Sequence, residues 1–193
     1  MLRHGWTVMV VGLFLAGVAT GSRAAEEGVF RLGLIGLDTS HVIAFTNMLN
    51  DPDHPDHVPG CKVVAGFKGG SPEIESSISR VEGYTQQLQD RWGVTIYDTI
   101  EELCENVDGV LLESVSGLPH LEQARPVIAA GLPLFIDKPL AGSLADALEI
   151  ARLAKAKGVP WFSASSLRFW SDVQKAASAD VVGDVLGCDA YSP

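Results

Sequence analysis

The residues best suited to binding an anion lie in the turn after an apolar run at positions 30–36. This turn reads Gly36-Leu37-Asp38-Thr39-Ser40-His41. Backbone N–H groups at the start of a helix favour a phosphate, and the dinucleotide fingerprint G-x-G-x-x-G uses such a turn. Only Gly36 fits that fingerprint, because Asp38 and His41 replace its second and third glycines. Two interpretations remain open: the turn binds an anion, or Asp38, Thr39 or Ser40 only caps the helix.

Polar residues also follow two later apolar runs. One run ends in Glu113-Ser114-Val115-Ser116, with Pro119-His120 opening the next helix, and the other ends in Asp137-Lys138-Pro139. The carboxyl ends of parallel strands line the binding crevice of an α/β sheet, so these side chains are expected to face one edge. A lysine there can act as a proton donor, which makes Lys138 the catalytic candidate. Each residue taken alone is equally typical of a loop in solvent.

Two further polar segments have simpler interpretations beside the chemical ones. The second apolar run, 62–67, is followed by Lys68 and not by the acidic residue that binds the ribose hydroxyls of NAD. Lys68 would favour the 2′-phosphate of NADP, or it is a solvated loop lysine. The loop Asp51-Pro52-Asp53-His54-Pro55-Asp56-His57 has ligands for a divalent ion. Adjacent Asp and His are common in turns without a metal, and we predict no metal site.

Apolar runs alternate with segments of helical spacing along most of the chain. The predicted strands are 30–36, 62–67, 94–97, 107–115, 134–136 and 159–163, and the predicted helices are 42–49, 83–91, 99–105, 118–130 and 143–157. Thr99 and Ser143 are expected to cap two of these helices, and Gly158 to end the last. Continuous apolar strands between helices indicate an α/β fold, a doubly wound parallel sheet.

Both ends of the chain depart from this alternation. Residues 1–25 combine Arg3, an apolar run at 8–19 and small residues up to Ala25, which is typical of a secretory signal peptide. We therefore expect a periplasmic or secreted protein, with a membrane anchor formed by an uncleaved leader as the alternative. A Rossmann-like domain is expected at 26–166. Residues 167–193 are expected to form a helix and one strand that begin a second α/β domain.

Composition excludes several classes of partner. The formal net charge is -10, from 14 Lys and Arg against 24 Asp and Glu. Nucleic acids and anionic membranes are bound through basic surfaces, so neither is expected as the main partner. The three cysteines, Cys61, Cys104 and Cys188, have no spacing typical of a metal or redox site. We expect them to be buried small apolar side chains and predict no disulfide.

Taken together, these motifs resemble the Gfo/Idh/MocA family of oxidoreductases. The similar stretches are 32–36, 119–124 and 131–141, followed by Arg168-Phe169 and Gly183-Asp184-Val185-Leu186-Gly187. Asp137-Lys138-Pro139 is similar to the family's Glu-Lys-Pro motif, with Asp in place of Glu. The resemblance covers the chain after its leader and keeps the order of the motifs.

The resemblance implies a nucleotide-binding domain for NAD or NADP. In the family a second domain supplies the pocket for a sugar or polyol-like substrate, an acid and histidine pair for proton transfer and usually the oligomer interface. The resemblance also implies that Lys138 contacts the nicotinamide ribose and the substrate. It further implies that Asp137 and His120 line the cofactor cleft. The set expected to contact the cofactor is Gly36, Asp38, Thr39, Ser40, His41, Lys68, Ser114, His120, Asp137, Lys138 and Pro139.

Two functions from different classes follow. The first is an NAD(P)-dependent oxidoreductase whose nucleotide-binding part is this chain, with a homo-oligomer expected. The second is an exported, non-catalytic binding module or pseudoenzyme that keeps the fold. We expect weak affinity for dinucleotides, because the Asp38 carboxylate would fill the space of a glycine and repel the phosphates. If Asp38 turns away, His41 would instead face the phosphate or a substrate.

Overall fold

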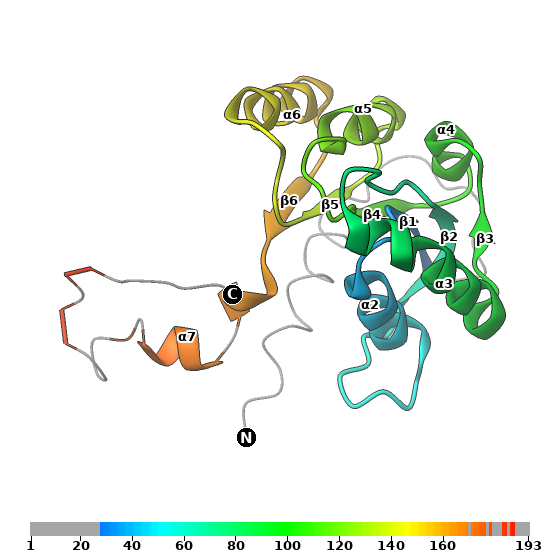
Figure 1. The fold of residues 1–193 in the computed structure, drawn as a ribbon, viewed down its shortest axis with the longest axis horizontal. Helices are drawn as coiled ribbons and strands as arrows, with labels where there is room; N and C mark the ends of the chain where they lie inside the picture. The colour runs from blue at the N-terminus through cyan, green and yellow to red at the C-terminus, as the bar shows by residue number, and fades with distance from the viewer. Residues whose placement is uncertain (1–27, 170, 177, 179–182, 185, 188–193) are drawn as a thin grey trace.

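A six-stranded parallel sheet forms the centre of the molecule (Figure 1). The computed structural model describes residues 28–169, 171–176, 178, 183–184 and 186–187. The strands are β1 (Phe30–Ile35), β2 (Cys61–Phe67), β3 (Thr95–Ile96), β4 (Gly109–Leu112), β5 (Leu134–Asp137) and β6 (Trp161–Ala164). Their order across the sheet is β3-β2-β1-β4-β5-β6. The chain thus winds outward from β1 in both directions, which confirms the doubly wound α/β fold.

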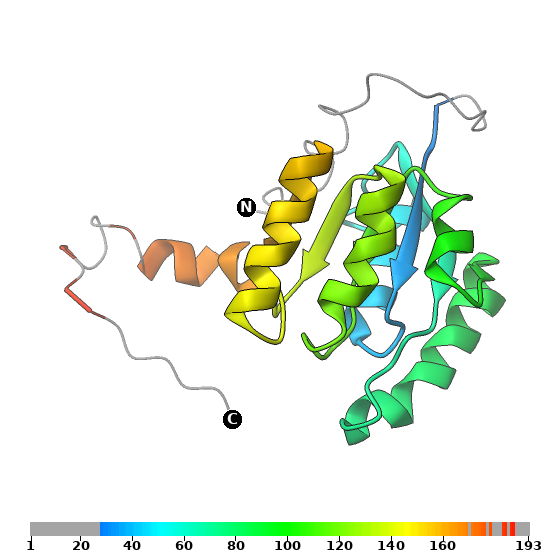
Figure 2. The ribbon, with the colours of Figure 1, turned by 90° about the horizontal axis from the view of Figure 1, so that it is seen from above.

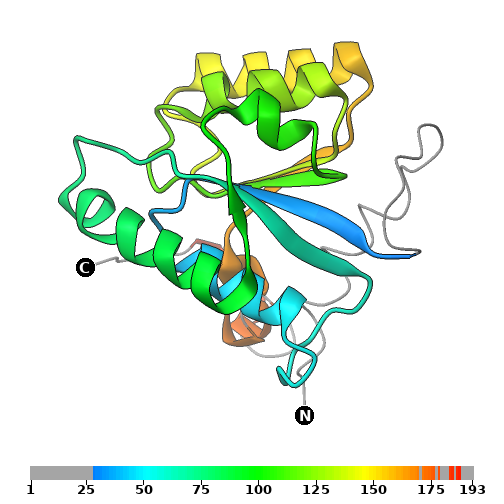
Figure 3. The ribbon, with the colours of Figure 1, turned by 90° about the vertical axis from the view of Figure 1, so that its right-hand side faces the viewer.

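Helices cover both faces of the sheet (Figure 3). They are α2 (Ser40–Asn50), α3 (Glu75–Trp92), α4 (Ile100–Cys104), α5 (His120–Ala130) and α6 (Leu144–Lys157). Helices α4, α5 and α6 pack on one face around Leu103, Val127 and Ile150. Helices α2 and α3 pack on the other face, where Val42 and Leu88 are completely buried. Because both faces are covered, most strand residues are apolar, as the continuous runs in the sequence predicted.

Local signals in the sequence place most helix ends correctly. The hydroxyl of Thr99 accepts a hydrogen bond from the Glu102 amide, and that of Ser143 accepts one from the Asp146 amide. Gly158 ends α6 with a φ of 71°, a left-handed conformation that glycine adopts without strain. The predicted caps are therefore confirmed.

The predicted start of the third helix is wrong. Helix α3 begins at Glu75, eight residues before the expected start, and Gly83 lies in its interior. Glycine weakens a helix by about 1 kcal/mol relative to alanine. Ser77, Thr85 and Leu88 are buried on one side of α3, so packing against the sheet outweighs that local cost. Strand β4 is also shorter than predicted, because Glu113 and the residues after it leave the sheet.

Beyond β6 the described chain continues as a 3-10 helix, η1 (Ser166–Phe169), and as α7 (Ser171–Ala176). Helix α7 lies to one side of the sheet and of its covering helices (Figures 1 and 2). The predicted signal peptide and most of the predicted strand at 183–191 lie outside the described residues. Within the described part of the chain, no helix is both long and apolar enough to span a membrane.

Cys61 and Cys104 behave as the sequence predicted. Both are buried and unbonded, whereas Cys188 lies outside the described residues. Burial raises the pKa of both thiols, and that of Cys104 reaches about 12. These two cysteines are therefore core side chains and not reactive groups.

Candidate functional site

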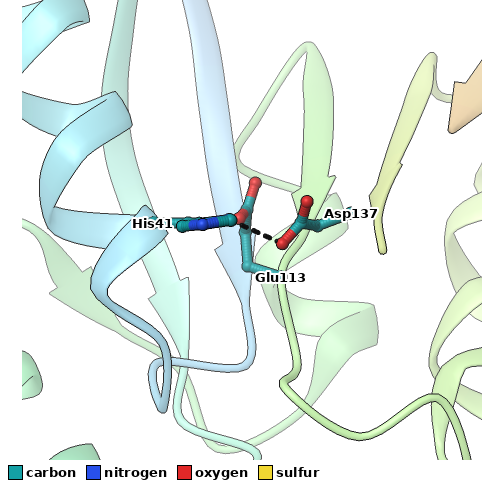
Figure 4. Close-up of side chains that lie close together, drawn as sticks. All are labelled: His41, Glu113 and Asp137. Atoms are coloured by element: carbon teal, nitrogen blue, oxygen red, sulfur yellow. Dashed lines mark hydrogen bonds and ion pairs between the residues drawn. The ribbon is translucent and has the colours of Figure 1, made fainter. Parts of the chain in front are cut away.

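Three side chains from different elements converge at the carboxyl edge of the sheet (Figure 4). His41 comes from the first turn of α2, Glu113 directly follows β4, and Asp137 is the last residue of β5. One ligand atom from each of the three lies within 4.8 Å of those of the other two. The sequence predicted that this edge would gather polar groups, because the three segments follow neighbouring strands β1, β4 and β5.

Asp137 is the centre of the polar contacts at this edge. His41 Nδ1 lies 2.7 Å from Asp137 Oδ2, a hydrogen bond between two residues that are 96 positions apart. The Lys138 ammonium lies 3.4 Å from the same carboxylate oxygen. Asp137 is only 2% exposed, whereas His41 is 25% and Lys138 is 45% exposed. The buried carboxylate thus holds an imidazole and an ammonium group at the carboxyl edge of the sheet.

Glu113 is the unusual member of the group. It is completely buried, and neither carboxylate oxygen has a hydrogen-bond partner among the residues that the structure describes. Burial raises the pKa of Glu113 well above its ordinary value of 4.5, and the nearby Asp137 raises it further. Lys138 acts in the opposite direction without reversing the shift. Glu113 was predicted to lie at this edge but was not among the predicted site residues. The available signal was an acidic residue directly after four buried apolar positions.

In the turn after β1, Asp38 does not point toward the space where it was expected to repel a phosphate. Asp38 is completely buried: its Oδ2 accepts a hydrogen bond from the Ser77 hydroxyl at 2.7 Å, and its Oδ1 accepts one from the Val115 amide at 3.1 Å. The carboxylate turns inward and ties α3 to the loop after β4. The expectation that Asp38 projects into the space of a phosphate is therefore corrected. The alternative, in which Asp38 turns away, agrees with the structure.

Two other residues of this turn form the start of α2. Thr39 is the N-cap of the helix, and its hydroxyl accepts a hydrogen bond from the His41 amide at 3.3 Å. Ser40 is exposed at the first position of α2. Gly36 is buried with a φ of 85° and packs directly against Ser114. The helix start therefore remains at the crevice, with the charge of Asp38 bonded behind it.

Ser114 and His120, both predicted to contact a cofactor, lie inside the protein. The Ser114 hydroxyl donates to the Gln123 side chain at 2.8 Å. His120 is completely buried, with Nε2 2.9 Å from the Ser114 carbonyl oxygen and Nδ1 3.2 Å from that of Leu140. The ring thus bridges the loop after β4 and the loop after β5. The prediction that His120 lines the cleft is corrected, because both ring nitrogens face backbone oxygens in the interior.

The remaining predicted residues lie away from the three converging side chains or at the surface. Lys68 binds both carboxylate oxygens of Glu82 on α3, at 2.9 and 2.8 Å, as an exposed ion pair. Pro139 is exposed after Lys138. In the loop at 51–57, Asp51 accepts from the Asp53 amide and pairs with Arg91, while His54 accepts from the Asp56 amide. Among the described residues, the group of metal-type ligands is His41, Glu113 and Asp137, and it includes no residue of this loop.

Comparison with known proteins gives a family match over most of the described sheet. Residues 30–165 match GFO_IDH_MocA, an oxidoreductase family with an NAD-binding Rossmann fold. No curated protein matches the chain.

Solved structures match the same fold at low sequence identity. The WlbA dehydrogenase from Chromobacterium violaceum, solved with NADH and UDP-GlcNAcA, is 19% identical with a TM-score of 0.60, over 84% of this chain and 43% of that one. Apo scyllo-inositol dehydrogenase from Lactobacillus casei is 17% identical with a TM-score of 0.56, over 77% and 39%. A probable dehydrogenase from Thermotoga maritima is 25% identical with a TM-score of 0.50, over 69% and 35%. The matches thus cover less than half of each solved chain.

Proposed function

Since the chain belongs to the Gfo/Idh/MocA oxidoreductase family, which has an NAD-binding Rossmann fold, we propose that it forms the nucleotide-binding part of an NAD(P)-dependent oxidoreductase. The proposed substrate is a sugar or polyol-like small molecule. The observation that carries the proposal is the group formed by His41, Asp137 and Lys138 at the carboxyl edge of a sheet with this family's fold. Such an edge is where ligands of open α/β sheets bind.

The turn after β1 is compatible with a dinucleotide phosphate, because the Asp38 side chain points into the protein. Its carboxylate is completely buried and accepts two hydrogen bonds, so its charge is not presented at the surface of the turn. The start of α2, with Ser40 exposed, offers the positive end of the helix dipole to an anion. Residues 39–41 would therefore hold the phosphates, and the residues after β5 would lie toward the nicotinamide.

The chain's own chemical contribution is to hold and move a proton. A bound nicotinamide cofactor would supply hydride transfer to or from the substrate carbon. When a carbonyl group is reduced, its oxygen must take a proton from an acid on the protein. The Lys138 ammonium is half-exposed at this edge of the sheet, so it is placed to donate that proton and, as the neutral amine, to take it back when the hydroxyl group is oxidised. Asp137 is a positioning residue, because its buried carboxylate lies 3.4 Å from the Lys138 ammonium and bonds His41.

Titration with NAD and NADP tests the proposal. We expect the chain to bind one nucleotide and Asp38→Asn to bind it with about the same affinity, because the buried Asp38 carboxylate is hydrogen-bonded to Ser77 and to the Val115 amide and does not face the phosphates. Asparagine keeps an acceptor for the Val115 amide, so this variant changes charge with little change of shape. Calorimetry measures both affinities. No binding of either nucleotide by either protein would contradict the proposal, and binding about tenfold tighter in Asp38→Asn would show that the Asp38 charge still repels the phosphates.

The non-catalytic binding module is not favoured by the family match. The chain spans 35–43% of the length of the three solved structures compared above. In the family resemblance, the substrate pocket and a second proton-transfer pair come from another domain.

We also propose export of the protein, on the strength of the apolar run at 8–19 and the small residues before Glu26. Expression with its leader is expected to yield exported protein that begins at Ala25 or Glu26. N-terminal sequencing measures this, and exported material that still begins at Met1 would support the uncleaved membrane anchor instead.

A further inference from the structure

We propose that His41, Glu113 and Asp137 bind one divalent transition-metal ion, with Zn²⁺ the best match to the donor set. The site combines one imidazole nitrogen with two carboxylates, a set that Zn²⁺ accepts at about 2.0–2.2 Å per bond. This inference goes beyond the proposed function and does not rest on it, because ion binding needs no nucleotide.

The geometry is close to that of a coordination sphere. The three ligand atoms lie within 4.8 Å of one another, and His41 Nδ1 and Asp137 Oδ2 are already 2.7 Å apart. Two ligands on one tetrahedral Zn²⁺ stand about 3.4 Å apart, given the usual bond lengths. Small side-chain rotations would therefore open the His41–Asp137 contact and bring Glu113 into bonding distance. Figure 4 shows the three side chains pointing toward a common centre from three elements.

Glu113 supplies the independent observation that points to a ligand. Its side chain is completely buried and points into the group, and both of its oxygens lack a partner among the described residues. Native proteins rarely leave a buried carboxylate unpartnered, because burying it without a donor or a cation is costly. The Lys138 charge acts on Glu113, but the Lys138 ammonium pairs with Asp137 instead. A bound cation would satisfy Glu113 and Asp137 together.

The site has an entrance and an open coordination position. His41 is 25% exposed, while Asp137 is 2% exposed and Glu113 is completely buried, so the ion would enter from the His41 side. Three protein ligands leave a fourth position on Zn²⁺ for water or another oxygen. That position would face the crevice, where a hydroxyl oxygen of a small molecule can bind.

Lys138 offers a substitution that should change the metal affinity in the opposite direction to a ligand substitution. Its ammonium lies 3.4 Å from the Asp137 oxygen that would bind the ion, and it is 45% exposed. Its positive charge would repel the ion at short range, although the exposed side chain can swing into solvent. Removing that charge should therefore strengthen ion binding, the opposite of what a ligand substitution does.

Calorimetric titration of EDTA-treated protein with ZnCl₂ tests the proposal. We expect one Zn²⁺ per chain, a 10- to 100-fold or greater loss of affinity in His41→Ala and in Glu113→Gln, and tighter binding in Lys138→Met. His54→Ala is the matched control, because His54 lies in the loop at 51–57 and should leave the affinity unchanged. MnCl₂ and MgCl₂ are expected to bind more weakly than ZnCl₂, given the imidazole ligand.

Thermal melts with and without ZnCl₂ give a second readout that also checks folding. Zn²⁺ at 100 times its Kd is expected to raise the Tm of the wild type by several degrees. It should leave the Tm of His41→Ala nearly unchanged, because that variant lacks the imidazole ligand. Absence of binding by the wild type at about 100 µM ZnCl₂ would overturn the proposal. So would loss of binding in His54→Ala alone, or equal binding by the wild type, His41→Ala and Glu113→Gln.

Discussion

Gly36→Ala is expected to lower the free energy of unfolding by about 2–5 kcal/mol. The residue has a φ of 85°, which costs an alanine about 1–2 kcal/mol. An added Cβ would also lie 2.5 Å from both Cα and the amide nitrogen of Ser114, and backbone atoms cannot move aside as a flexible side chain does. Overpacking of this kind adds about 1–3 kcal/mol or more. Denaturant unfolding measures the loss.

Gly60→Ala is the matched control for this substitution. Gly60 has nearly the same φ, 87°, but no atom lies within 4 Å of the position of a new Cβ. Gly60→Ala should therefore lower the free energy of unfolding only by the cost of a positive φ for alanine, about 1–2 kcal/mol. The difference between the two variants measures the close approach of β1 and the loop after β4. Equal losses in the two variants would show that the contact with Ser114 relaxes freely.

Glu113→Gln is expected to stabilise the metal-free protein at pH 7–8 by about 1 kcal/mol or more, because the neutral amide does not carry the pH-dependent cost of a buried carboxyl group with a raised pKa. The pKa of Glu113 is raised in the folded state by burial and then by Asp137. The folded protein therefore keeps a proton that the unfolded chain releases above about pH 4.5. The stability that this group contributes is complete below that pH and is lost as the pH rises toward the folded-state pKa. Glu113→Gln should lack this decline in the free energy of unfolding between pH 4.5 and neutral pH.

Unfolding in EDTA across pH 4–8 measures the effect, and Glu149→Gln is its control. Glu149 is an exposed glutamate whose pKa is lowered, chiefly by its hydrogen bond to Arg152. Its stabilising contribution is therefore present at neutral pH and is lost as the pH falls, the opposite sign to Glu113. The two variants should diverge in opposite directions at neutral pH. A Glu113→Gln profile parallel to that of the wild type would show that Glu113 does not titrate in this range.

Local sequence patterns were sufficient for the architecture. Continuous apolar runs predicted all six strands, and their alternation with helical segments predicted a parallel sheet covered on both faces. Thr99 and Ser143 marked helix starts, because a capping hydroxyl bonds an amide only three residues away. The position of the polar edge followed from the same reasoning, since parallel strands end together.

The detailed roles at that edge depended on contacts between distant residues. His41 and Asp137 are 96 positions apart, and Asp38 is 77 positions from Val115. No local pattern shows whether Asp38 faces solvent or the Val115 amide, or that His120 reaches two backbone oxygens. The burial of Glu113 likewise depends on how β4, β5 and α2 pack together. The sequence by itself determined the elements and the shared edge, because periodicity and caps act over a few residues. Only the tertiary structure decided which polar groups are bonded inside and which face a ligand, because that depends on partners brought together by folding.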